Sequence, residues 1–218
     1  MSDPLKRYWE MRLEACRQAL AANNFGAYRA NDRVDAKRIV MEEILPGVAA
    51  RTASWGDSMT LHATGILAAV KENPAYEVIE TFAAGVPREE LLKRRRQAFL
   101  TDLFFTGSNA VTEAGQLVNL DMVGNRTGGI TFGPRNVIIL AGRNKIVPDL
   151  AAAMARIKSY AAPINAIRHA GLKTPCRKTS YCADCKSPDR ICNTWTITEK
   201  AFPKGRIRVV LVNEDLGL

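Results

Sequence analysis

Four of the chain's five cysteines fall within seventeen residues, in the segment CRKTSYCADCKSPDRIC at positions 176–192. They are spaced C-x5-C-x2-C-x6-C, and the segment has no histidine, so a metal bound there would have only sulfur ligands. Both zinc sites and iron–sulfur clusters use the C-x2-C pair as a local chelating turn. The sequence therefore predicts a metal site with the ligands Cys176, Cys182, Cys185 and Cys192.

The cysteine spacing leaves the identity of this metal open. Zinc sites often have two C-x2-4-C pairs separated by a longer loop, whereas here the outer cysteines stand singly on either side of one pair. This arrangement favours a [4Fe–4S] cluster, with zinc as the alternative. The surrounding segment 156–218 has twelve Lys or Arg and only five Asp or Glu, and this positive excess would offset the negative thiolates. Cys16 lies far from the motif, and we expect it to take no part.

Two further stretches have the residue types that bind small anions. The first, SWGDSMTLHATG at 54–65, predicts a strand, a glycine turn and a helix capped by a hydroxyl side chain. Exposed N–H groups at such a helix start attract anions, although an ordinary capped helix needs the same residues. The candidate ligand-binding residues here are Gly56, Ser58, Met59 and Thr60.

The second stretch, FFTGSNAVTEAGQLVNLDMVGNRTGG at 104–129, places small and polar residues directly after an apolar strand. Open α/β sheets bind ligands at this position, the carboxyl end of a strand. The glycine spacing does not match a dinucleotide-binding fingerprint, and turn chemistry (a hairpin at EAGQ, a loop at GNRTGG) is the simpler alternative. The candidate ligand-binding residues are Thr106, Gly107, Ser108, Asn109, Asn125 and Arg126.

Other chemistries are less well supported by the sequence. A Ser/His/Asp triad is not expected, because the chain has only His62 and His169 and no nucleophile-elbow motif. The net charge of +9 raises the possibility of nucleic-acid binding, but no aromatic residues are interleaved with the basic run REELLKRRRQ at 88–97. That run predicts a solvated helix with Glu89–Lys93 and Glu90–Arg94 ion pairs, and we therefore do not expect nucleic acid as a partner.

Strands and helices alternate along the chain, which predicts an α/β fold with a mostly parallel sheet flanked by helices. Apolar strands are expected at 25–30, 76–82, 102–111, 117–123, 136–142 and 206–217, and the runs VIIL and VVLV suit strands buried on both faces. We expect helices over 5–22, 32–47 (with Val34, Ile39 and Ile44 inward), 56–73, from Pro87, and over 147–160. The simplest organisation is one domain, 1–218, with an N-terminal helical lead (1–24) and a cysteine-rich loop (173–193) before the last strand.

Taken together, these stretches resemble the LUD domain (lactate-utilization) family. The resemblance lies in WGDSMTLHATGI, in the long stretch from DLFFTGSNAV to LAGRNKIV (102–147), in TPCRKTSYCADCKSPDRICN and in IRVVLVNEDLG. It implies a fold shared with ribose-5-phosphate isomerases, glucosamine-6-phosphate deaminases and CoA transferases, which bind anionic metabolites at strand ends. Within the matched stretch we include Lys145 among the ligand-binding candidates, and the resemblance implies Glu113 as a candidate base or nucleophile.

Two functions remain open from the sequence. In the first, the protein binds a small anionic metabolite, holds an iron–sulfur centre and acts with redox partner subunits in 2-hydroxy acid (lactate) oxidation. In the second, it is a metabolite-binding or regulatory module with a structural zinc site and no catalysis. No apolar run approaches the roughly eighteen residues that span a bilayer, and the charged N-terminal stretch lacks the features of a signal peptide. We therefore expect a cytoplasmic protein without a membrane span.

Overall fold

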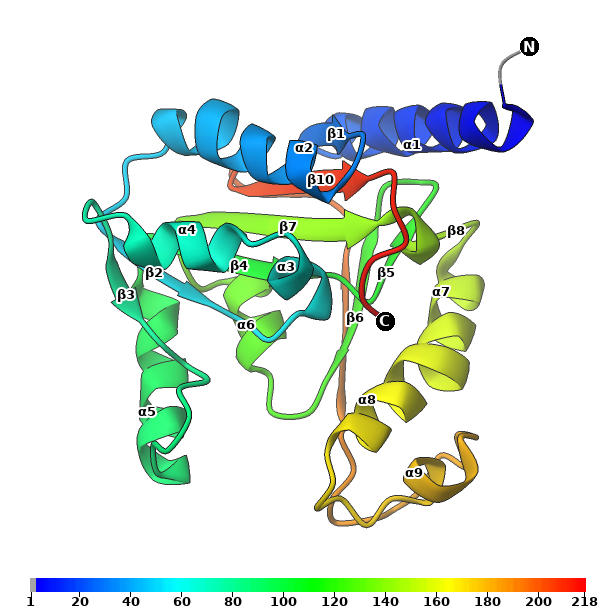
Figure 1. Ribbon diagram of the computed structural model, residues 1–218. Helices are drawn as coiled ribbons and strands as arrows, with labels where there is room; N and C mark the ends of the chain where they lie inside the picture. The colour runs from blue at the N-terminus through cyan, green and yellow to red at the C-terminus, as the bar shows by residue number, and fades with distance from the viewer. Residues whose placement is uncertain (1–2) are drawn as a thin grey trace.

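The structure, a computed structural model, describes residues 3–218 (Figure 1). The strands are β1 (Gly26–Ala30), β2 (Thr52–Trp55), β3 (Glu77–Ile79), β4 (Leu103–Gly107), β5 (Ala110–Thr112), β6 (Leu117–Asp121), β7 (Asn136–Gly142), β8 (Ile146–Val147), β9 (Thr194–Thr198) and β10 (Ile207–Val212). The α-helices are α1 (Pro4–Ala22), α2 (Arg33–Arg38), α3 (Met59–Ala63), α4 (Ile66–Glu72), α5 (Arg88–Gln97), α6 (Asn125–Thr131), α7 (Leu150–Arg156), α8 (Ala162–Arg168) and α9 (Pro175–Thr179). Shorter π- and 3-10-helical turns are η1 (Ile39–Ile44), η2 (Leu45–Gly47), η3 (Ala98–Leu100), η4 (Arg143–Lys145) and η5 (Ile157–Ala161).

Six parallel strands form the central sheet, in the order β1-β10-β7-β4-β2-β3. Its middle strands β7 and β10 are buried on both faces, because side chains that alternate along each strand enter two different apolar cores. On β7, for example, Ile138 and Leu140 pack on one face, and Val137 and Ile139 on the other. The structure thus confirms the predicted α/β fold with a mostly parallel sheet and the doubly buried VIIL and VVLV strands.

Helices cover both faces of this sheet (Figure 1). On one face the core is formed with α2, η1, η2, α3 and α4, and on the other with α1 and α6. Cys16 of α1 is fully buried in the second core, so its packing in the core explains its presence in an otherwise polar helix. The helical lead predicted over 1–24 corresponds to α1, and its first two residues lie outside the described part of the chain.

A second sheet, in the order β8-β5-β6-β9, extends from the carboxyl end of β4. Strands β5 and β6 pair antiparallel across the predicted EAGQ turn, where Gly115 adopts a left-handed conformation with φ of +78°. Strands β8 and β9 were not predicted, because β8 has only two residues and β9 follows the cysteine segment as an edge strand. The cysteine segment therefore precedes β9 rather than the last strand.

Two helix predictions and one loop prediction need correction. Val34 is 73% exposed rather than inward, whereas Ile39 and Ile44 are buried as expected. The helix predicted over 56–73 is broken at Gly65, whose left-handed conformation (φ +68°) separates α3 from α4. The GNRTGG segment is not a loop, because its last five residues fall within α6.

Helix α5 begins after Pro87 and has no buried residue, as its charge pattern predicts. Glu90 pairs with Arg94, with 3.1 Å between Nε and Oε1, while Lys93 lies 4.0 Å from Glu90 instead of pairing with Glu89. Within residues 3–218, none of the helices combines the length and apolar character needed to cross a bilayer.

Candidate functional site

A cavity of about 210 Å³ lies where the central sheet, the second sheet and α8 meet. We refer to it as the central cavity. Most of the predicted ligand-binding residues line it, from the starts of α3 and α6 and the ends of β4 and η4: Ser58, Met59, Gly107, Ser108, Asn109, Asn125, Arg126 and Lys145. The two candidate stretches, 54–65 and 104–129, therefore meet at one place, at the carboxyl ends of the strands.

The other three candidates, Gly56, Thr60 and Thr106, are not among the residues that line the cavity. Gly56 is required by close packing, because a Cβ there would lie only 2.5 Å from Cγ of Arg126. Thr60 is fully buried and accepts a hydrogen bond from the Lys145 amine. The Thr106 hydroxyl is buried without a hydrogen-bond partner within residues 3–218. These residues thus lie behind the cavity wall.

The wall of the central cavity is organised by the guanidinium group of Arg126, whose side chain is 11% exposed. It donates to Oδ1 of Asn109 at 2.8 Å, to Oδ1 of Asn119 at 3.2 Å and to the Leu120 carbonyl at 3.0 Å. Its Nε lies 3.5 Å from the carboxylate of Asp121, which also accepts the main-chain N–H groups of Arg126 and Thr127 at the start of α6. One buried cation therefore connects β6 and α6 with the residues that follow β4.

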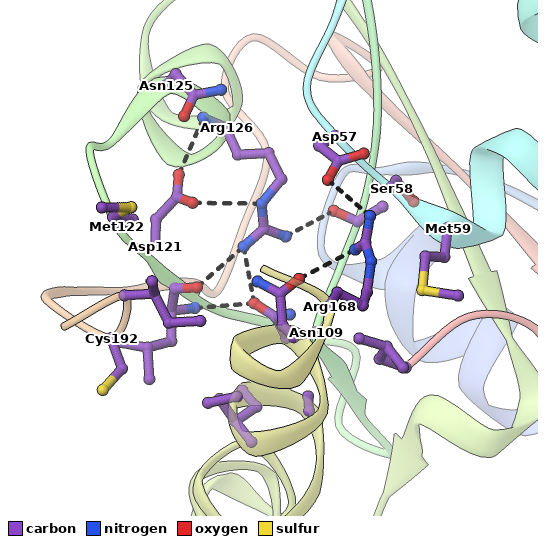
Figure 2. A pocket seen from close by; sticks show the side chains of 18 of the residues that line it. Asp57, Ser58, Met59, Asn109, Asp121, Met122, Asn125, Arg126, Arg168 and Cys192 are labelled. Atoms are coloured by element: carbon purple, nitrogen blue, oxygen red, sulfur yellow. Dashed lines mark hydrogen bonds and ion pairs between the residues drawn. The ribbon is translucent and has the colours of Figure 1, made fainter. Parts of the chain in front are cut away.

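A second ion pair joins two residues that line the cavity. Arg168, at the end of α8, donates to Asp57 at 3.3 Å and to Asn165 at 3.0 Å. Figure 2 shows Arg168 beside Asp57 and Arg126 beside Asp121. His62 lies 3.4 Å from Asp57 with a half-exposed side chain, whereas His169 lines the cavity. Arg168 had no sequence signal for this site, because it lies 111 positions from Asp57.

Arg95 also lines the central cavity, although the sequence pattern did not indicate this. It lies on α5, in the run that predicts a solvated helix, yet it lines the central cavity. Its guanidinium stacks on the Phe82 ring, 4.6 Å from the centroid, and its buried Nε has no hydrogen-bond partner within residues 3–218. Burial lowers the pKa of Arg95, which means that its charge is incompletely solvated. An anion bound in the cavity would compensate this charge.

Lys145 brings a buried amine to the same cavity. It is 5% exposed, and its Nζ donates to Oγ1 of Thr60 at 2.8 Å. Burial, with smaller contributions from Arg156 and Arg126, lowers the pKa of Lys145 to about 7. A large fraction of this amine is therefore neutral near neutral pH, unlike an ordinary surface lysine.

Glu113 lies outside the central cavity. It follows β5, its carboxylate forms an ion pair with Arg12 of α1, and its side chain is 47% exposed. Glu113 is thus held against α1, away from this cavity.

The four predicted metal ligands line a second, smaller cavity of about 20 Å³, which we refer to as the cysteine cavity. Cys176 comes from α9, Cys182 and Cys185 from the following loop, and Cys192 from the residues before β9. The donors are all sulfur, which fits an iron–sulfur cluster or zinc. Among residues 3–218, however, no three side chains of the ligand types are arranged to hold a single ion, so the metal site stays a prediction.

Arg190 fastens the loop that carries these cysteines. Its guanidinium donates to the carbonyl of Cys185 at 2.7 Å and to that of Cys192 at 2.9 Å. It also bonds Asp184 at 2.9 Å, and Asp184 in turn accepts from Lys158 at 2.7 Å. These contacts tie the cysteine segment to η5 without using the sulfur atoms.

The two cavities share a wall. Ala162, Ile191 and Cys192 line both of them. Figure 2 shows Cys192 at the edge of the central cavity, with its sulfur directed away from Arg126. A group bound by the cysteines would therefore be separated from a ligand in the central cavity by one layer of residues.

Comparison with known proteins gives one family match. The model of the family described as LUD domain matches residues 13–212. Among solved structures, a crystal structure of a DUF162 family protein from Deinococcus radiodurans aligns with 95% of this chain and 97% of that chain, at 13% sequence identity and a TM-score of 0.48. None of the curated proteins compared with the chain matches it.

Proposed function

The chain belongs to the LUD domain family, and from this premise we propose that it binds a small carboxylate in the central cavity and an iron–sulfur cluster at its four cysteines. In this proposal the protein acts within a 2-hydroxy acid (lactate-type) oxidation system. The observation that carries the proposal is the wall that the central and cysteine cavities share. It would place a small metabolite and a redox group side by side.

The charges of the central cavity support an anionic ligand. Arg126 and Arg168 are each compensated by an aspartate, but Arg95 has no ion-pair partner within residues 3–218. The volume of about 210 Å³ is below the range typical of drug-sized ligands, which favours a metabolite of a few carbon atoms. Ser58, Ser108 and Asn125 add polar groups that can orient its hydroxyl or carbonyl oxygen.

The cysteines Cys176, Cys182, Cys185 and Cys192 would hold the cluster, and Arg190 would keep their loop in place. When bound, such a cluster supplies one-electron transfer. Oxidation of a 2-hydroxy acid to a 2-oxo acid releases two electrons, so redox partner subunits would have to remove them. This chain's own residues would bind and orient the carboxylate and separate it from solvent.

Metal analysis of protein purified without oxygen tests the cluster directly. We expect about four irons per chain and a broad absorption band near ~400 nm. About one zinc per chain and no colour would contradict the redox proposal and favour a structural site.

Replacing Arg95 with glutamine tests the anion site. We expect the affinity for a small 2-hydroxy or 2-oxo carboxylate, such as lactate or pyruvate, to fall about tenfold, or about 1.4 kcal/mol. The free energy of unfolding should fall by less than about 1 kcal/mol, because Arg95 makes no ion pair and the substitution breaks only its stacking on Phe82. Isothermal titration calorimetry with each carboxylate measures the affinity.

Arg96→Gln is the matched control, because Arg96 is the next residue of α5 and is exposed. It removes the same charge without touching the cavity, so its affinity should remain that of the unmodified protein. Equal losses of affinity in the two variants would show that binding depends only on the net positive charge of the protein. They would contradict a specific role for Arg95.

A further inference from the structure

The amine of Lys145 occupies an unusual position for a lysine. It is 5% exposed, it faces the central cavity, and no carboxylate within residues 3–218 forms an ion pair with it. Fully buried lysines are rare unless they are paired with an opposite charge. Structural packing alone therefore does not account for an amine here, since an apolar side chain would fill the same space at lower cost.

The neighbouring groups fix the orientation of this amine. Thr60 Oγ1 donates its proton to the carbonyl of Leu216 at 3.0 Å and therefore accepts from Lys145 Nζ, 2.8 Å away. The segment 216–218 closes over this pair, because a Cβ on Gly217 would lie 2.5 Å from Thr60 Oγ1 and 3.4 Å from Nζ. With one N–H directed to Thr60, the lone pair of a neutral amine points elsewhere.

Burial and the neighbouring charges disfavour the protonated form of Lys145. Arg156 of α7 and Arg126 of α6 are both cationic, and α3 contributes the neutral Thr60 hydroxyl. Together with burial they lower the pKa of Lys145 to about 7. The neutral amine is the nucleophilic form, and lysines in such desolvated, cationic surroundings are suited to imine formation.

We propose that Lys145 is a catalytic amine that forms an imine with the carbonyl carbon of a 2-oxo carboxylate held in the central cavity. This inference rests on the proposed function, because Arg95 would bind the carboxylate of the same molecule. It adds a covalent step to that binding and narrows the ligand class to carbonyl acids.

The step is redox-neutral and balanced. The nitrogen lone pair adds to the carbonyl carbon as the C=O π pair moves to oxygen, which gives a carbinolamine after proton transfer from nitrogen. Loss of this oxygen as water, with the second amine proton, forms the C=N bond. One ketone and one primary amine therefore give one imine and one water, and no oxidant is needed.

Reductive trapping tests the proposal. The full-length protein is incubated with pyruvate and cyanoborohydride at pH values about one unit above and below 7, and intact and peptide masses are measured. We expect one reduced adduct per chain, located on Lys145. Unmodified Lys145, or adducts spread evenly over surface lysines, would overturn the proposal.

Substitutions test whether Lys145, rather than another lysine, forms the adduct. Lys145→Arg keeps a cation but cannot form an imine, and Lys145→Met is a second variant should the larger guanidinium prevent folding. Both should abolish the adduct, with folding checked by thermal unfolding. Lys158→Arg is the control, because Lys158 binds Asp184 near the cysteine segment and does not line the cavity. It should retain the adduct.

Acetone, a ketone without a carboxylate, distinguishes the two proposals. Trapping of pyruvate but not acetone on Lys145 supports both the imine and the anion site. Equal trapping of both ketones would overturn the assignment to 2-oxo acids. If pyruvate binds by calorimetry but leaves Lys145 unmodified, the imine proposal fails while the proposed metabolite site stands.

Discussion

Replacing Arg126 with leucine is expected to lower the free energy of unfolding by about 3 kcal/mol and to abolish ligand binding in the central cavity. The substitution removes the cation from an ion pair in which both side chains are nearly buried, with exposures of 11% for Arg126 and 12% for Asp121. It also leaves the side-chain oxygens of Asn109 and Asn119 without one of their donors. The loss of stability should lie at the low end of the range for a broken buried ion pair, because Asp121 still accepts two main-chain N–H groups.

A double-mutant cycle shows whether the lost ion pair causes this destabilisation. Asp121→Asn removes the negative charge but keeps an oxygen that can accept the N–H groups at the start of α6. In the Asp121→Asn/Arg126→Leu protein no buried charge is left alone, so its destabilisation should be smaller than the sum of the two single effects. Denaturant unfolding measures all four proteins. Strict additivity would contradict a direct Arg126–Asp121 coupling.

The apolar runs of the central sheet made its strands predictable. Val137–Leu140 and Val209–Val212 are continuous apolar segments, and only a sheet covered on both faces can bury them completely. The polar residues after β4 were predictable for a related reason, because parallel strands present their carboxyl ends at one edge. Ser108, Asn109 and Arg126 meet there as expected.

The partners of these residues were not predictable, because tertiary packing alone brings them together. Asp57 and Arg168 are 111 positions apart, and no pattern in either segment indicates the other. Arg95 lies in a helix whose charges pair with one another, so its sequence is typical of a solvated surface. Its position in the cavity wall follows only from the three-dimensional structure, in which Arg95 stacks on Phe82 and lines the cavity.

Helix α6 shows a second reason why part of the structure was not predictable from the sequence. GNRTGG contains three glycines, which disfavour a helix, and a loop was the simpler alternative for this segment. In the structure the carboxylate of Asp121 accepts the first N–H groups of this segment, and a Cβ on Gly129 would lie 2.6 Å from the Phe104 ring. Glycine is thus used for close packing of the helix on β4, and a tertiary contact overrides local preference.

Cys182→Ser is expected to abolish the metal site while leaving the central sheet folded. Cys182 is exposed, so the substitution removes one sulfur ligand without removing core packing. We expect the metal content to fall from about four irons per chain to less than about one, with loss of the absorption band. Because metal binding contributes to the folding of its own loop, residues 173–193 should also become sensitive to proteolysis.

Cys16→Ala is the matched control, and we expect it to lower the stability of the fold without changing the metal content. Cys16 is fully buried in the core between α1 and the sheet, where burial raises the pKa of its thiol to about 12, and it lies outside the cysteine cavity. Its loss should lower the free energy of unfolding by about 1 kcal/mol through a small core cavity and leave the metal content unchanged. Metal loss in Cys16→Ala, or full metal content in Cys182→Ser, would contradict the assignment of the metal to the four-cysteine segment. Iron analysis and limited proteolysis of the two variants thus separate a metal-dependent loop from the core that supports it.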